Sequence, residues 1–327
     1  MKREPEVRIG LTTSFLPRKR SADELLRRVT MELYMMEKLI SSLLAFFLAF
    51  VPSVSQKPID IPDSGVEIIF AGDTMLGRSV MGASLDNNDF LYAFRNVSDF
   101  LKDADITFLN LENPIVKNCQ RHVGGFKFCT TYEIANGLNF AGVDVVSLAN
   151  NHSGNYGNDG FEETKKYLEE SGIKSVGYNN LEIIKKNGIK FGFLGFNYTF
   201  SNQSLEKDLK LISDSNSLVD VLIVTVHWGE EYKEVANDFQ KTTAKKMVES
   251  GADVIIGHHP HWVQNYEEIN GKPVYYSLGN FIFDQVWSEE TKKGLVVKVT
   301  FDEDGNIIKK EEFKTYTKNI GQPEIWQ

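Results

Sequence analysis

Eight short apolar runs constrain the fold of this 327-residue chain more than any other feature. They are short and rich in β-branched and aromatic residues, which is typical of buried strands. The runs are "VEIIFAG" at 66–72, "ITFLNLE" at 106–112, "DVVSLAN" at 144–150, "IKFGFLGF" at 189–196, "DVLIVTVHWG" at 220–229, "DVIIGHH" at 253–259, "PVYYSLGNF" at 273–281 and "GLVVKVTF" at 294–301. Because helical patterns lie between several of them, the chain is predicted to form an α/β sheet.

Three segments between the apolar runs have helical spacing. They are residues 90–104, and residues 160–172 and 238–252, which each end close to a glycine. The last apolar runs lack long helices between them and are predicted to be antiparallel, with a hairpin at "FDEDGNI", 301–307. No repeat or linker follows Gly65, so we expect a single domain over residues 56–327.

Polar clusters stand where the apolar runs end, and this is where ligand sites gather in α/β sheets. The clusters are "FAGDTMLGR" with Asp73, "FLNLENP" with Glu112, "SLANNHSGNYG" with Asn151 and His152, "VTVHWGEEY" with His227, and "GHHPH" with His258, His259 and His261. Each has an ordinary alternative: a turn or cap residue, a solvated loop charge, or a core histidine. Their joint occurrence favours a metal site, since imidazole, carboxylate and amide groups are all metal ligands.

These motifs together carry a family resemblance. "GD", "ANNH", "HWGEEY", "GADVIIGHHPH" and "YSLGNFIFD" resemble the CapA family of poly-γ-glutamate capsule synthesis proteins, over residues 66–285. That family is in turn similar to the calcineurin-like metallophosphatases. The resemblance implies a four-layer α/β/β/α sandwich of the metallo-dependent phosphatase type, with a metal centre at the strand ends.

The resemblance also implies roles for individual residues. Its metal ligands are Asp73, Glu112, Asn151, His227, His259 and His261, holding one or two divalent ions for which Mn, Fe or Zn is expected. Glu112 takes the bridging position, and His152 is the adjacent catalytic histidine that donates a proton. His258 stays open, because the extra histidine allows a register one residue earlier.

The chain departs from the metallophosphatase pattern at Met75, where that superfamily has a histidine. A thioether is a poor ligand for such cations, so we expect Met75 near a first site that is short of a ligand. Arg78 is a candidate catalytic residue that clamps an anion, or a surface arginine. Asn280 and Asp284 belong to the family motif and line the pocket or a sheet edge.

The N-terminal segment, residues 1–55, is predicted to be an extension with a targeting signal. An apolar run at 39–51 precedes Ser53 and Ser55, which is the pattern of a secretory signal cleaved after Ser55. An uncleaved membrane anchor is the alternative. The upstream residues 1–35 are either a long leader or precede a true start at Met35 or Met36. We therefore expect an extracytoplasmic protein, secreted or anchored by this segment.

Charge limits the partners. Residues 56–327 carry 27 Lys and Arg against 39 Asp and Glu, a net charge of −12. This balance argues against a nucleic-acid groove. The expected partners are an anionic polymer or phosphoester substrate and, by resemblance, membrane capsule-synthase subunits.

The two cysteines, Cys119 and Cys129, flank a Gly-Gly turn and could face each other across a hairpin. In an exported protein this pattern indicates one disulfide, and two reduced thiols are the alternative. Only His122 lies between them, which is too few ligands for a structural zinc site.

Two functional hypotheses follow. The first is an extracytoplasmic CapA-like protein of capsule or poly-γ-glutamate metabolism that is a metal-dependent hydrolase, cleaving a phosphoester or amide bond with a metal-activated water. The second is a non-enzymatic component of poly-γ-glutamate synthesis, export or anchoring at the membrane. The acidic surface disfavours the second, because it repels polyglutamate outside the pocket.

The mature protein is predicted to begin near Gln56 and to be exported. Cell fractionation followed by N-terminal sequencing of the purified protein tests this. A cytoplasmic protein that retains residues 1–35 would contradict both the predicted signal and the predicted start codon.

Overall fold

The computed structural model describes residues 22–49, 65–200 and 204–326. The chain divides into two compact units, residues 1–60 and 61–327. The first unit contributes one described helix, α1 (Ala22–Ala49). Among the described helices, none combines the length and apolar character needed to cross a membrane. The predicted cleavage point after Ser55 lies outside the described residues.

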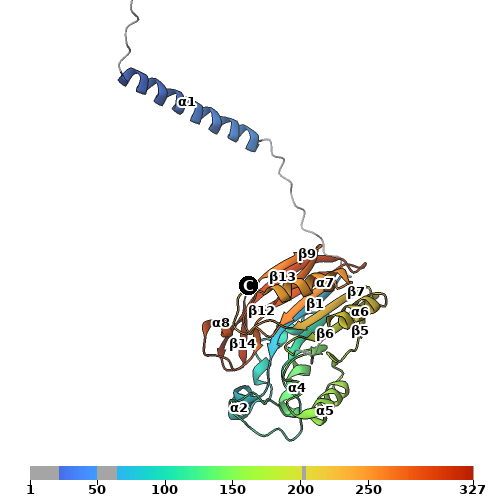
Figure 1. Ribbon diagram of the computed structural model, residues 1–327. Coiled ribbons are helices and arrows are strands. Elements are labelled where there is room, and N and C mark those ends of the chain that lie inside the picture. Colours follow the sequence, from blue (N-terminus) through green and yellow to red (C-terminus); the bar gives the residue numbers. More distant parts are fainter. Residues whose placement is uncertain (1–21, 50–64, 201–203, 327) are drawn as a thin grey trace, which may run out of the picture. The chain divides into compact units, whose positions relative to one another are not determined.

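The described part of the second unit contains two β-sheets (Figure 1). The first has the order β14 (Gln322–Trp326), β13 (Ile307–Asn319), β12 (Lys293–Phe301), β1 (Val66–Thr74), β2 (Ile106–Leu111), β3 (Val145–Ser147) and β4 (Lys174–Val176), and β11 (Asn280–Ile282) also pairs with β1. The second has the order β5 (Glu182–Lys186), β6 (Ile189–Asn197), β7 (Val221–His227), β8 (Val254–His258), β10 (Lys272–Tyr275) and β9 (Tyr266–Ile269).

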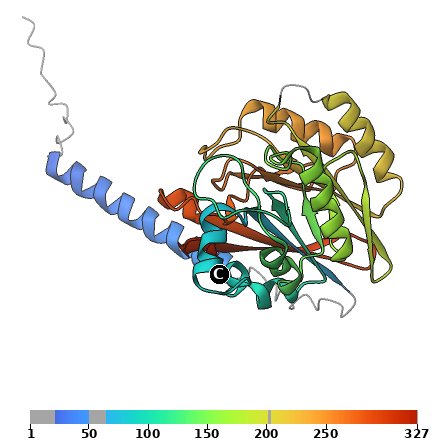
Figure 2. The same ribbon diagram turned by 90° about the horizontal axis from the view of Figure 1, so that it is seen from below.

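Helices cover the outer faces of both sheets. They are α2 (Arg78–Asp86), the 3-10 turn η1 (Tyr92–Phe94), α3 (Ser98–Lys102), α4 (Tyr132–Phe140), α5 (Gly157–Glu170), α6 (Leu205–Asn216) and α7 (Asp238–Glu249), and the short helix α8 (Glu289–Lys292) precedes β12. Figure 2 shows α6 and α7, in yellow and orange, together along one side of the unit. Helices α2 to α5 contribute to the core on the outer face of the first sheet.

Alternating side chains divide the core into three apolar layers, because successive residues of a strand point to opposite faces. In β2, Leu109 packs outward with the helices of the first sheet, whereas Phe108 packs inward with Phe193 of the second sheet. In β7, Ile223 joins the inner layer and Val224 packs outward with α6 and α7. Three apolar layers separate four layers of structure, so the predicted α/β/β/α sandwich is confirmed.

Parallel strands form the centre of each sheet. β1, β2, β3 and β4 are parallel, as are β6, β7, β8 and β10. β12, β13 and β14 are antiparallel, as predicted for the last runs. The hairpin predicted at residues 301–307 joins β12 to β13, with Gly305 at a φ of 82°. A left-handed φ of this kind favours glycine.

The run at 273–281 corrects the antiparallel prediction. It divides into β10, which is parallel to β8 in the second sheet, and β11, which is parallel to β1 in the first. The short strand β9 forms an antiparallel pair with β10 and reverses the chain, so β10 can run parallel to β8 without a long helix. This segment therefore crosses from one sheet to the other beside the strand ends.

The helix predictions have mixed outcomes. Helices α5 and α7 confirm the patterns at 160–172 and 238–252. The pattern at 90–104 forms η1 and α3 instead of one helix, and the Asp89 carboxylate accepts the Leu91 N–H just before η1. The apolar residues Phe94, Val97 and Leu101 still face the core.

A bulge in β1 determines which way Asp73 points. Phe70 belongs to the inner layer and Ala71 to the outer layer, so strict alternation would place Asp73 on the outer face. The pairing of β1 with β2 shifts between Phe70 and Asp73, which adds one residue to the count. Bulges of this kind re-aim side chains beside functional sites. The Asp73 carboxylate consequently points inward, to the ends of the second sheet.

The glycine that precedes the histidines is predicted to be required for stability. A Cβ on Gly257 would lie 2.0 Å from the Tyr276 carbonyl oxygen, because the crossing segment packs directly against β8. We expect Gly257→Ala to destabilise the fold by about 1–3 kcal/mol, as overpacking does. Chemical denaturation measures this. The control is Gly154→Ala, where a Cβ has no neighbour within 4 Å; an effect there beyond about 0.5 kcal/mol would undermine the comparison.

Candidate metal centre

Three buried side chains form the centre of the candidate site. Asp73 comes from β1, Glu112 follows β2, and His227 ends β7, so both sheets contribute. One ligand atom from each lies within 4.8 Å of the others. All three are at most 1% exposed. The structure therefore brings together three of the six predicted ligands at the carboxyl ends of parallel strands.

Asn110 connects these three residues and was missed from the sequence. Its Nδ2 donates to Asp73 Oδ1 at 2.9 Å and to Glu112 Oε1 at 2.9 Å, and lies 3.3 Å from His227 Nδ1. It is fully buried. Two amide hydrogens thus face three acceptors. Asn110 shares the inward face of β2 with Phe108 and Glu112, and this period-two spacing is the signal that could have identified it.

The three clustered histidines take different places. His258 ends β8 and points inward, where its Nδ1 lies 3.2 Å from Asp73 Oδ1 and its ring lies 6.1 Å from that of Phe108. The His259 ring lies 4.8 Å from the His227 ring. His261 Nδ1 lies 3.1 Å from Asp73 Oδ2. All three histidines of "GHHPH" therefore lie around the group formed by Asp73, Glu112 and His227.

Unusual backbone conformations place the last two histidines. His259 has a φ of 97° and His261 a φ of 57°. Residues other than glycine rarely adopt such angles, each of which costs roughly 1–3 kcal/mol, and they cluster at functional sites. The turn at His259 ends the strand alternation that directs His258 inward. Both His259 and His261 are consequently brought back to the group instead of facing the outer helices.

The loop after β3 carries Asn151 and His152. Asn151 Oδ1 lies 2.9 Å from His227 Nε2, so this predicted ligand also joins the group. Asn150 organises the loop: its Oδ1 accepts the N–H groups of His152 and Ser153. The His152 ring lies beside Asn151, with Nε2 3.3 Å from the Asn151 amide nitrogen. His152 makes none of the carboxylate contacts described for the other histidines.

Hydrogen bonds identify the tautomer of His152. Asn155 Oδ1 accepts the Phe128 N–H at 2.7 Å, which identifies that atom as the amide oxygen. The same oxygen lies 3.3 Å from His152 Nδ1, and this contact favours the tautomer with the proton on Nδ1. Nε2 is left as the acceptor, facing the Asn151 amide.

Arg78 is not a free surface arginine. Its Nη2 pairs with Asp284 Oδ1, and its Nη1 donates to the Gly125 carbonyl at 2.9 Å. Its guanidinium also lies 4.3 Å from the centre of the Phe128 ring. Asp284 therefore balances the charge of the predicted anion clamp. Asn280 accepts from His261 Nδ1 at 2.9 Å and orients that ring.

Met75 packs within the apolar core between the first sheet and its helices. Its Sδ accepts the Gly77 N–H at 3.0 Å. It offers no ligand atom to the group of Asp73, Glu112 and His227. Where the metallophosphatase pattern has a histidine, this chain therefore has an apolar side chain that contacts the turn into α2.

Burial and mutual charge move the pKa values of the group apart. Burial raises the pKa of Glu112, and the nearby Asp73 charge raises it further, well above its ordinary value. Burial opposes ionisation of Asp73 as well, but His258 and His261 hold its pKa well below the ordinary value. Burial lowers the pKa of His227, and burial followed by the His261 charge lowers that of His259 to about 4. Neutral imidazole is the form that binds metals.

The donor set fits a divalent cation. Among the described residues, Glu112 Oε2 and His259 Nδ1 are buried atoms without a hydrogen-bond partner. Buried polar atoms are nearly always paired, so such orphans in one cluster indicate a missing ligand. Carboxylate, amide and imidazole donors together suit Mn, Fe or Zn. The roles of the six residues as ligands remain predictions.

The four layers and the donor set at the strand ends define an α/β protein with a candidate divalent-metal centre. Residues 67–285 match the model of the bacterial capsule synthesis protein family PGA_cap, and the chain belongs to that family. The predicted resemblance is thus confirmed.

Two relatives illustrate the match. The chain is 34% identical to the capsule biosynthesis protein CapA of Bacillus anthracis over 265 residues, 72% of this chain and 64% of that protein. It is 30% identical to the PGA biosynthesis protein CapA of Bacillus subtilis (strain 168) over 257 residues, 72% of this chain and 67% of that protein. The chain therefore spans about two thirds of the length of these relatives.

A solved structure has a similar fold. A hypothetical protein from Thermus thermophilus matches with a TM-score of 0.52 at 14% identity, covering 76% of this chain and 98% of that chain. At this identity the likeness concerns the fold alone.

Asn110 is predicted to orient the ligands of the candidate centre. We expect Asn110→Ala to lower the affinity for Mn²⁺ or Zn²⁺ roughly 10–100-fold, as loss of a side chain that orients metal ligands does. Competition with a chelating dye measures this, with Asn118→Ala, an exposed position, as the control. Equal affinity in the two variants, with both folded, would show that Asn110 does not orient the ligands.

Proposed function

We propose that the protein acts outside the cytoplasm in capsule or poly-γ-glutamate metabolism, as a metal-dependent hydrolase of a phosphoester or amide bond. The observation that carries this proposal is the buried group of Asp73, Glu112 and His227 with the unpaired Glu112 Oε2 beside it. Family membership supports the metabolic setting, and the names of the two Bacillus relatives refer to capsule and PGA biosynthesis.

Six side chains would hold one or two divalent cations in this proposal: those of Asp73, Glu112, Asn151, His227, His259 and His261. Such a cation lowers the pKa of water and polarises a substrate oxygen. The protein holds the ligands in place through Asn110 and Asn280. The surrounding burial excludes bulk water, which strengthens every charge interaction at the centre.

His152 is the proposed proton-exchanging group. Because Asn155 keeps a proton on Nδ1, exchange takes place at Nε2, the atom beside Asn151. In the resting tautomer Nε2 accepts a proton; donation to a leaving group, as expected from the family pattern, follows only after Nε2 has taken one up. Asp284 balances the charge of Arg78, and the unpaired Arg78 Nε–H would donate to the anionic part of the substrate.

The proposed location and partners have separate support. The Cys119–Cys129 disulfide suits an oxidising compartment, and the N-terminal apolar run suits an export signal. The substrate would be an anionic polymer or a phosphoester, and membrane capsule-synthase subunits would be protein partners. The net charge of −12 over residues 56–327 disfavours nucleic acid.

Two alanine variants separate metal binding from catalysis. We expect His227→Ala to lose most bound metal, because it removes a central ligand. We expect His152→Ala to keep the metal and to lose turnover roughly 10²–10⁴-fold, the usual contribution of general acid–base catalysis. Metal analysis and turnover of a generic phosphodiester and of polyglutamate measure these effects.

Each variant is the control for the other. Unchanged metal content in His227→Ala would refute the proposed centre. A wild-type protein that binds metal but hydrolyses neither compound would favour the non-enzymatic role in polymer synthesis, export or anchoring.

A further inference from the structure

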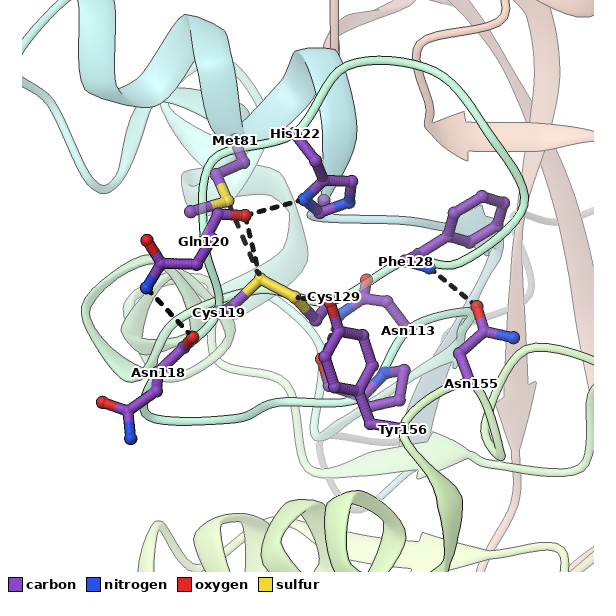
Figure 3. The surroundings of a disulfide bond; sticks show 12 residues. Met81, Asn113, Asn118, Cys119, Gln120, His122, Phe128, Cys129, Asn155 and Tyr156 are labelled. Atoms are coloured by element: carbon purple, nitrogen blue, oxygen red, sulfur yellow. Dashed lines mark hydrogen bonds between the residues drawn. A yellow bond between two sulfur atoms is a disulfide. The ribbon is translucent and has the colours of Figure 1, made fainter.

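The disulfide loop, residues 119–129, borders the candidate site without contributing a ligand. Cys119 and Cys129 form a disulfide, with Cα atoms 5.9 Å apart, which confirms the predicted pair. The loop between them is irregular, and the hairpin considered from the sequence does not form. Figure 3 shows the disulfide with His122 and Phe128 on the loop, and Asn155 reaching Phe128 from the neighbouring segment.

Phe128 contacts both candidate catalytic side chains. Its ring centre lies 4.0 Å from that of His152, at an interplanar angle of 30°. The Arg78 guanidinium carbon lies 4.3 Å from the same ring. Stacking on an aromatic face attracts a guanidinium and limits its movement. Phe128 is only 2% exposed, so its ring is buried against these two side chains and the surrounding core.

The backbone of the loop holds the same two residues. The Phe128 N–H donates to Asn155 Oδ1, the oxygen that fixes the His152 tautomer. The Gly125 carbonyl accepts from Arg78 Nη1, and His122 Nε2 lies 3.3 Å from the Arg78 N–H. Arg78 itself has a φ of 45°. A strained backbone angle of this kind persists only where its surroundings enforce it.

The middle of the loop supplies little packing of its own. Val123 is 75% exposed and Phe126 is 85% exposed. A Cβ on Gly124 or Gly125 would have no neighbour within 4 Å. The ends are anchored instead, where the Cys129 backbone packs against Gly77 at the start of α2. The disulfide joins these two ends, and a cross-link of this type acts by restricting open conformations of the loop.

We propose that Phe128, held by the Cys119–Cys129 disulfide, is a positioning residue that fixes the His152 ring and the Arg78 guanidinium for the reaction. The claim that Phe128 affects turnover rests on the proposed function. The claim that Phe128 fixes the position of His152 does not. The disulfide loop thereby makes the alignment of the site depend on an oxidised cysteine pair. Metal binding at the candidate centre is independent of it, because none of the six predicted ligands lies on the loop.

The first test observes His152 directly by NMR of the full-length protein with labelled histidine. The signals of His152 are assigned with a His152→Gln variant. In the oxidised wild type, the ring current of Phe128 shifts the His152 ring protons upfield. We expect Phe128→Leu to abolish that shift. The matched control is Phe126→Leu, on the exposed tip of the same loop, where the shift remains.

The second test opens the disulfide without touching Phe128. A water-soluble phosphine breaks the S–S bond and gives two thiols; the phosphine supplies two electrons and becomes the oxide, and water supplies the two protons and the oxygen atom. We expect loss of the upfield shift in the reduced wild type and in Cys119→Ser/Cys129→Ser. The double variant should not respond to the phosphine, which shows that the reagent acts through this pair.

The third test measures metal content and turnover in the same samples. We expect kcat/KM for a phosphodiester to fall roughly 10–100-fold in Phe128→Leu and in the reduced protein, the effect of a misplaced catalytic group. Bound Mn²⁺ should stay unchanged, and Phe126→Leu should match the wild type in both. A purely structural role would instead lower metal content and turnover together.

The outcomes separate the two proposals. Unchanged His152 signals in folded Phe128→Leu and in the reduced protein would overturn the positioning role, whatever the turnover. A wild type without hydrolysis would overturn the proposed enzyme, and the NMR result would still decide the positioning of His152. If Phe128→Leu fails to fold, the reduced wild type and the cysteine double variant give the decision.

Discussion

The charge of Asp73, fully buried between two sheets, is the constraint on which the rest of the site depends. An ionised carboxylate at such a place costs several kcal/mol unless donors surround it. Asn110 Nδ2 donates to it at 2.9 Å and the His259 N–H at 3.3 Å, and the His258 and His261 Nδ1 atoms lie 3.2 and 3.1 Å from its oxygens. They come from β2, from β8 and from the loop after it. Keeping Asp73 satisfied therefore fixes the ends of both sheets against each other and gathers the remaining polar side chains around one point.

The sequence predicts much of this arrangement because two simple periodicities control it. Apolar runs that end in polar residues predict the strand ends, and parallel strands bring those ends together, which is why Glu112 and His227 lie where expected. Asn110 was missed because it stands inside an apolar run instead of after it, although it shares an inward face with Glu112. The bulge in β1 and the left-handed angles at His259 and His261 were not predictable, since they depend on contacts made only in the folded chain.

The border of the site depends on contacts distant in sequence. Arg78 pairs with Asp284, 206 residues later, and Phe128 stacks on His152 from a loop that two cysteines close. The cysteine pattern indicated a disulfide, but it did not predict that the disulfide loop would place the Phe128 ring against His152. Met75 was expected beside the first metal as a position that supplies no ligand, and the fold packs it in the apolar core. The family pattern points to residues that the fold brings together, but it does not point to the residues that orient them.

The most direct measurement of the central claim is an anomalous difference map from crystals of the protein grown with Mn²⁺. We predict a peak about 2.0–2.2 Å from donor atoms of Asp73, Glu112 and His227, the distance of direct ligation. A second peak beside Asp73 and His261 would indicate two ions. A map without density among these side chains, or with its main peak elsewhere on the molecule, would contradict the metal centre and the hydrolytic function built on it.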